Sequence, residues 1–205
     1  MTPYLYPISK QEGSMLEMEK YRRLLKSSRK TIERLRREKK ELYERACVDP
    51  LTEVGNGYAL KELSAKLEKL PKKIKEGQND LIAVLYVDVD NFKIINREYG
   101  HRGGDLILKE FVEVLRGLFQ RKADSIIRLG GHSDEFIVVW LARDKKQTEE
   151  YIAMAKSFLA WVRMPKSNIY FSASVGSAIG KLGRETLEEI IQAADIDMYK
   201  NKKGC

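Results

Sequence analysis

The apolar residues near the start of the chain follow a heptad pattern. From residue 18 they recur at alternating spacings of three and four, along a seam of Met18, Tyr21, Leu25, Ser28, Ile32, Leu35, Lys39, Leu42 and Ala46. Only Ser28 and Lys39 are polar. The pattern predicts a coiled-coil helix of about four heptads that ends before Asp49-Pro50. A single amphipathic helix packed on its own domain is the alternative.

Beyond residue 49, helical and strand periodicities alternate. Helices are expected over Tyr58–Leu70, Leu106–Phe119, Thr148–Val162 and Thr186–Tyr199, and strands over Leu81–Val89, Ser125–Leu129, Asp134–Leu141 and Ile169–Ile179. This order favours an α+β fold in which an antiparallel or mixed sheet carries helices on one face, in a ferredoxin-like βαββαβ layout. We therefore divide the chain into a flexible tail (1–14), a coiled-coil signalling and dimerisation helix (15–48, the stalk) and a globular domain (49–205).

The composition argues against a membrane-spanning protein and against a secreted protein rich in disulfides. Hydrophobic residues make up 43% of the chain, yet the longest apolar runs, such as Leu81–Val87, are too short to span a bilayer. The first residues lack the apolar core of a secretory leader, and the two cysteines, Cys47 and Cys205, form no disulfide or zinc pattern. We expect no transmembrane segment and a cytoplasmic location.

The positive charge of the chain is concentrated in the stalk. The net charge is +8, and residues 14–48 contain twelve Lys and Arg against six Glu, which leaves the rest nearly balanced. A basic helix can bind DNA or an anionic membrane. The interleaved Glu residues instead indicate the solvated surface of a coiled coil, so no nucleic-acid partner is expected.

Two acidic pairs lie at strand ends. Asp88 and Asp90 end an apolar strand and share one face by alternation, and Asp134-Glu135 begins the strand after the hairpin. If these strands are neighbours, the sheet brings the pairs together as oxygen ligands for Mg²⁺ or Mn²⁺. That arrangement suits metal-assisted nucleotidyl transfer. An acid pair that is simply hydrated at a strand end remains the alternative.

The stretch Asp88–Asp105 resembles, without a gap, the pattern D-x-D-x-F-K-x-x-N-x-x-x-G-H-x-x-G-D of diguanylate cyclases of the GGDEF family. Residues 49–57 are similar to the D-x-L-T-G-L-x-N-R opening of that family, with Glu53 in place of Gly and Gly57 in place of Arg. Residues 194–202 resemble its closing A-D-x-A-L-Y-x-A-K. The resemblance covers residues 49–204 and implies a nucleotidyl-cyclase-type sheet with flanking helices.

The resemblance also implies roles for individual residues. A Mg²⁺ or Mn²⁺ ion would be held by the side chains of Asp88 and Asp134 and the carbonyl of Val89. The catalytic residues would be Asp88, Asp134, Glu135 and Lys93. GTP would be bound by Phe92, Lys93, Asn96, Asp105, Gly130, Gly131 and Lys202. The positive charge of lysine favours contact with phosphates. An amide and a carboxylate can together form hydrogen bonds with the donor and acceptor atoms of the guanine edge. Asn96 as a helix cap and Asp105 as a first-turn acid are the structural alternatives.

The family signature R-x-G-G-D/E-E-F is interrupted in this chain. It reads Arg128-Leu-Gly-Gly-His-Ser-Asp-Glu-Phe136, with His132 and Ser133 inserted. Because strand side chains alternate with a period of two, an even insertion can leave the face of Asp134 unchanged. We expect the altered tip to slow condensation while leaving GTP binding near normal.

Arg121 and Asp124 resemble the R-x-x-D site at which cyclic di-GMP inhibits members of this family. An arginine guanidinium can donate two parallel hydrogen bonds to a phosphate, and a carboxylate can accept hydrogen bonds from guanine. A surface ion pair worth under about 1 kcal/mol is the alternative.

The leading hypothesis is a diguanylate cyclase that works as a homodimer formed by the stalk and condenses two GTP into cyclic di-GMP. The alternative is a degenerate domain that binds GTP or cyclic di-GMP and signals without turnover.

Overall fold

The computed structural model describes residues 10–70, 81–131, 133–163 and 170–202. The chain divides into two compact units, Met1–Ala46 and Cys47–Cys205. Among the described residues, no helix is both long enough and apolar enough to cross a bilayer.

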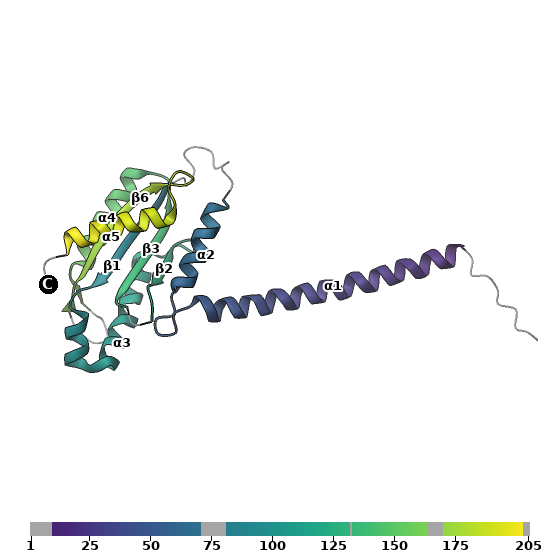
Figure 1. Ribbon diagram of the computed structural model, residues 1–205, viewed down its shortest axis with the longest axis horizontal. Helices are drawn as coiled ribbons and strands as arrows, with labels where there is room; N and C mark the ends of the chain where they lie inside the picture. The colour runs from purple at the N-terminus through teal and green to yellow at the C-terminus, as the bar shows by residue number, and fades with distance from the viewer. Residues whose placement is uncertain (1–9, 71–80, 132, 164–169, 203–205) are drawn as a thin grey trace, which may run out of the picture. The chain divides into compact units, whose positions relative to one another are not determined.

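The described residues of the first unit belong to one continuous helix, α1, which runs over Lys10–Cys47 (Figure 1). It begins at residue 10, before the expected start of the stalk at residue 15. The apolar side chains of the heptad seam are exposed in this chain: the exposed fraction is 61% for Leu25 and 52% for Leu35. Apolar residues at these positions are what a coiled-coil partner would cover.

The second unit is built on a four-stranded sheet in the order β2-β3-β1-β6, in which every neighbouring pair is antiparallel. Its strands are β1 Leu81–Val89, β2 Ser125–Arg128, β3 Glu135–Ala142 and β6 Ala173–Lys181. A separate ribbon pairs β4 Val162–Arg163 with β5 Tyr170–Phe171. The helices are α2 Gly57–Glu68, α3 Phe92–Leu118, α4 Lys145–Leu159 and α5 Leu187–Asn201. The predicted α+β class and the ferredoxin-like strand layout are confirmed.

Helices cover both faces of the sheet, which corrects the expectation of one covered face. The odd-numbered residues of β1 pack with α3 and α4, and its even-numbered residues up to Tyr86 pack with α5 and α2. The two groups of helices are seen on either side of the strands in Figure 1. Because β1 is apolar at nearly every position, both of its faces need cover. The crossover helices α3 and α4 share one face, as a βαββαβ core requires.

Two predicted elements differ most from the structure, and the helix expected over 148–162 is observed over Lys145–Leu159. Helix α3 begins at Phe92, well before the expected residue 106, and contains a break at Gly100, where φ is 70°. The strand expected over 169–179 is divided into β5 and β6, and residue 169 lies outside the described residues. Asn91, with φ of 56°, turns the chain from β1 directly into α3, so the residues after the acidic pair are helical.

A buried ion pair fastens the start of the globular unit to the sheet. Arg128 Nη1 lies 3.1 Å from Asp49 Oδ1, and both side chains are almost fully buried. Asp49 also accepts hydrogen bonds from the backbone N–H and hydroxyl of Thr52. Burial by itself would raise the pKa of Asp49, but these hydrogen bonds and Arg128 outweigh it and lower the pKa.

Candidate nucleotide site

The site begins where the central strand ends. In the antiparallel register of β1 and β3, Asp88 lies directly opposite Glu135. Directly opposed residues place their side chains on the same face, so the two acidic pairs are brought together as expected. Asp88 is buried, with an exposed fraction of 8%.

Lys202, at the C-terminal end of α5, completes this acidic pair. Its Nζ lies 2.9 Å from Asp88 Oδ1. Helix α5 reaches this position because it packs directly on β6 at Gly176. A Cβ at Gly176 would lie 2.0 Å from the carbonyl oxygen of Ala194 and 2.1 Å from the nitrogen of Met198. The absence of a side chain at Gly176 thus sets the height of α5 above the sheet.

Asp134 lies beside this pair, opposite Val89 and not opposite Asp88. Its backbone carbonyl accepts a hydrogen bond of 3.2 Å from the N–H of Val89. Burial raises the pKa of the Asp134 carboxyl, and the negative charges of Asp88 and Glu135 raise it further. The acid that faces Asp88 across the strands is therefore Glu135, and Asp134 approaches from the adjoining turn.

The donor set at this edge fits a hard divalent cation that is shared with a substrate. Within the described ranges, no three His, Cys, Asp or Glu side chains are grouped closely enough to hold a metal ion alone. Mg²⁺ commonly takes one or two carboxylates and completes its shell with phosphate oxygens and water. Asp88, Asp134 and the carbonyl of Val89 offer such a partial set, and the crowding of negative charge that raises the pKa of Asp134 is what a cation would relieve.

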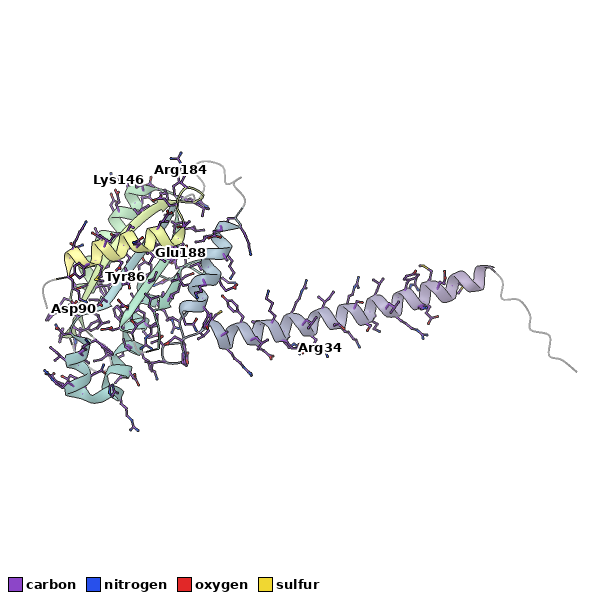
Figure 2. The ribbon with its side chains drawn as sticks, viewed as in Figure 1. Arg34, Tyr86, Asp90, Lys146, Arg184 and Glu188 are labelled. Atoms are coloured by element: carbon purple, nitrogen blue, oxygen red, sulfur yellow. The ribbon has the colours of Figure 1, made fainter. Side chains whose placement is uncertain are left out.

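Asp90, the second acid of the strand end, is held by β6 and the residue before it. Its carboxylate accepts hydrogen bonds from the hydroxyls of Ser172, at 2.5 Å, and Ser174, at 2.6 Å. Figure 2 labels Asp90 and Tyr86, which belong to the same stretch of chain at the end of β1. Asp90 therefore ties the end of β1 to its neighbour and is not arranged with Asp88 as a second ligand.

The residues expected to bind GTP lie mainly on α3. Phe92 is buried and Lys93 is exposed in the first turn, and Asp105 is exposed after the break at Gly100. Asn96 lies close to Gly104 in the second half of the helix. The approach is so close that a Cβ at Gly104 would lie 2.0 Å from Asn96 Oδ1. Asn96 and Asp105 thus both lie on this broken helix, one on each side of the break.

The signature residues form the turn between β2 and β3. The strands close with a hydrogen bond of 3.0 Å from Leu129 N–H to the carbonyl of Glu135. Gly130 has a φ of 74°, which favours glycine, and Gly131 is exposed. Ser133 N–H lies 3.5 Å from the carbonyl of Gly130, and His132 lies outside the described residues.

Two residues to which the sequence assigned no contact in the site bond to Glu135. The hydroxyl of Tyr86 donates to Glu135 Oε1 at 3.1 Å, and the hydroxyl of Ser133 donates to Glu135 Oε2 at 3.0 Å. Burial raises the pKa of Tyr86, and the charge of Glu135 raises it further, so the phenol stays protonated and can donate. The alternation of β1 places Tyr86 on the face of Asp88 and could have signalled it.

Arg121 and Asp124 lie at a second location, between α3 and β2. Arg121 Nε donates to Asp124 Oδ1 at 3.1 Å, and its backbone N–H donates to Oδ2 at 3.0 Å. Both residues line an open groove of about 740 Å³ whose other lining residues include Gln147 and Tyr151 of α4. The two predicted side chains are therefore adjacent and paired to each other.

This antiparallel sheet, with a buried acid, a facing acid and a lysine at the end of its central strand, defines a domain of the nucleotidyl-cyclase type. The family model described as "Diguanylate cyclase, GGDEF domain" matches residues 46–204. The chain therefore belongs to the GGDEF family.

Relatives and solved structures agree with this assignment. The bifunctional diguanylate cyclase/cyclic di-GMP phosphodiesterase MucR of Pseudomonas aeruginosa is 33% identical over 82% of this chain and 24% of its own length. Diguanylate cyclase DgcP of Escherichia coli is 32% identical over 84% of this chain and 49% of its own length. The chain thus spans between a quarter and half of these relatives. The coiled coil and GGDEF domain of DgcB from Caulobacter crescentus, solved with c-di-GMP, shares the fold with a TM-score of 0.66 at 21% identity, covering 89% of this chain and 94% of that one.

Proposed function

We propose that this chain is a diguanylate cyclase, which condenses two molecules of GTP into cyclic di-GMP. The observation that carries the proposal is the apposition of Asp88 and Glu135 with Lys202 at the end of β1. Paired carboxylates beside a lysine can hold a cation and a triphosphate together. Membership of the GGDEF family supports the same reaction.

In the proposed reaction, the 3′-hydroxyl oxygen of each GTP attacks the α-phosphorus of the other. Two P–O bonds form, two pyrophosphates leave, and the hydroxyl protons pass to solvent or to an acidic side chain. When bound, Mg²⁺ or Mn²⁺ neutralises phosphate charge. Asp88, Asp134 and the Val89 carbonyl would hold that cation, while Lys93 and Lys202 would orient the phosphates.

The remaining substrate contacts would fix the nucleotide. Asn96 and Asp105 would read the guanine edge, with the carboxylate accepting from N1–H and the exocyclic amine. Phe92, Gly130 and Gly131 would shape the surface around the phosphates. Since one protomer holds one GTP, the reaction needs two copies, and the exposed heptad seam of α1 is our candidate for joining them.

The test is to incubate the chain with GTP and Mg²⁺ and to detect cyclic di-GMP by chromatography. Asp88→Asn should abolish product formation while leaving the far-UV circular dichroism spectrum unchanged, because it removes a charged ligand. Product at the wild-type rate from Asp88→Asn would show that this acid has no such role.

The second candidate function is a binding module without turnover. The interruption of the signature by His132 and Ser133 favours it. Metal-dependent GTP binding by the wild-type chain, with no cyclic di-GMP after prolonged incubation, would decide for this candidate.

We further propose that cyclic di-GMP binds at Arg121 and Asp124, and we expect calorimetry to detect this binding. Arg121→Ala should abolish the binding, because the guanidinium is 60% exposed and can turn from Asp124 to a phosphate. Arg23→Ala, which removes another exposed ion pair, is the matched control and should bind normally. Equal binding by Arg121→Ala would contradict the proposal.

A further inference from the structure

Ser133, one of the two residues inserted in the signature, precedes β3 and makes several contacts. The Oγ of Ser133 accepts a hydrogen bond of 3.0 Å from the backbone N–H of Glu135 and donates one of 3.0 Å to the carboxylate of the same residue. The carbonyl of Ser133 accepts from Arg128 Nε at 2.9 Å. Ser133 is thereby fixed to the buried ion pair on one side and to Glu135 on the other.

Glu135 is held at both of its carboxylate oxygens. Tyr86 reaches Oε1 from β1, and Ser133 reaches Oε2 from the turn. Two donors on one planar group restrict its rotation, and each oxygen keeps a further lone pair for a ligand. Glu135 is also the residue that faces Asp88 in the strand register, so the pair of hydroxyls decides how the carboxylate is presented to that acid.

We propose that Ser133 and Tyr86 are positioning residues that hold the Glu135 carboxylate toward Asp88, so that Ser133 of the insertion belongs to the site. This inference rests on the proposed function, and it reverses part of the expectation drawn from the sequence. An insertion that only displaced the glycines would make no contact with the acids. Ser133 instead supplies a hydroxyl to Glu135, and the signature pattern of the family has a glycine at the corresponding place before its acid pair.

The chain offers a matched control for this hydrogen bond. Ser64 Oγ on α2 donates to Glu188 Oε2 on α5 at 2.9 Å, another bond between a serine and a glutamate. Glu188 lies in the first turn of α5, whereas Lys202 follows its last turn. In Figure 2, Glu188 and Asp90 are labelled well apart, with Tyr86 between them. Ser64→Ala therefore removes an equivalent bond away from the site.

The experiment compares the full chain with Ser133→Ala, Ser133→Thr, Tyr86→Phe and Ser64→Ala. Calorimetry measures Mn²⁺ affinity in the presence of the α,β-methylene analogue of GTP, which cannot release pyrophosphate, and steady-state assays measure kcat and KM with GTP. Ser133→Ala and Tyr86→Phe should each lower Mn²⁺ affinity and kcat by about 10-fold, because the Glu135 carboxylate that lies opposite the proposed metal ligand Asp88 loses a partner that orients it. KM for GTP should stay within about 2-fold, because the nucleotide contacts are retained.

Rescue separates positioning from a purely structural role. Ser133→Thr keeps the hydroxyl and should restore both quantities, and Ser64→Ala should match the wild type. Wild-type Mn²⁺ affinity and kcat in Ser133→Ala would overturn the inference. If the wild type binds Mn²⁺ with the analogue but makes no product, the cyclase proposal fails. The positioning role of Ser133 and Tyr86 is then tested by the Mn²⁺ affinities of the variants alone. If the wild type binds no Mn²⁺, both proposals fail.

Discussion

Glu53 has a backbone conformation that non-glycine residues rarely adopt. Its φ is 57°, at the position where the GGDEF opening pattern has glycine. A side chain in this left-handed region costs about 1–2 kcal/mol. We expect Glu53→Gly to raise the free energy of unfolding by about 1 kcal/mol, measured by urea denaturation. Glu53→Ala keeps a Cβ and should give no such gain. An equal gain would show that the carboxylate of Glu53, and not its backbone conformation, is the destabilising feature.

The buried pair of Asp49 and Arg128 makes the stability of the globular unit depend on pH. Asp49→Asn should cost about 3 kcal/mol at neutral pH, because it leaves the buried guanidinium without a countercharge. The double variant with Arg128→Met should recover part of that loss. If Asp49→Asn is as stable as the wild type, the pair contributes nothing.

The sign of the pH effect follows from the lowered pKa of Asp49. The stabilisation is fully present above its ordinary value of 3.8 and is lost as pH falls through the lower pKa of the folded state. Wild-type unfolding free energy should therefore fall more steeply than that of Asp49→Asn below about pH 4. Parallel curves over that range would contradict this origin.

At the scale of elements, the sequence predicts the helices and strands whose apolar residues recur with a regular period. It does not predict features that depend on contacts between distant parts of the chain. Strand β1 is predicted with its observed bounds because its residues are apolar at nearly every position. The first half of α3 is missed because most of its residues are exposed and its apolar contacts with the core are few, chiefly those of Phe92 and Ile95. The bond from Tyr86 to Glu135 joins residues 49 positions apart and depends on strand register, which local pattern does not specify.

The packing of α5 on β6 gives a prediction at the same scale. Gly176→Ala would place a Cβ against the backbone of α5, where no side chain can move aside. We expect a loss of about 1–3 kcal/mol and weaker GTP binding, because Lys202 moves with the helix. Gly117→Ala, an open position in α3, is the control and should be neutral or stabilising. Normal GTP binding by Gly176→Ala would show that the helix position is not critical.

At the scale of the whole molecule, the proposed reaction requires two chains, and the seam of α1 is the surface we expect to join them. Leu25→Asp with Leu35→Asp should convert a dimer into a monomer in sedimentation at high micromolar concentration and abolish turnover, since charges in a coiled-coil seam are costly. Leu24 is similarly exposed but lies off the seam, so Leu24→Asp should remain dimeric. A seam variant that stays dimeric would assign dimerisation to another surface.

The ion pair between Lys202 and Asp88 joins residues 114 positions apart, on the last helix and the first strand of the sheet. The pair therefore spans the intervening elements of the domain and depends on the packing of α5 on the sheet. The nucleotide binding proposed at this pair would thus require α5 in place, and we expect a chain with an unfolded α5 to bind GTP poorly.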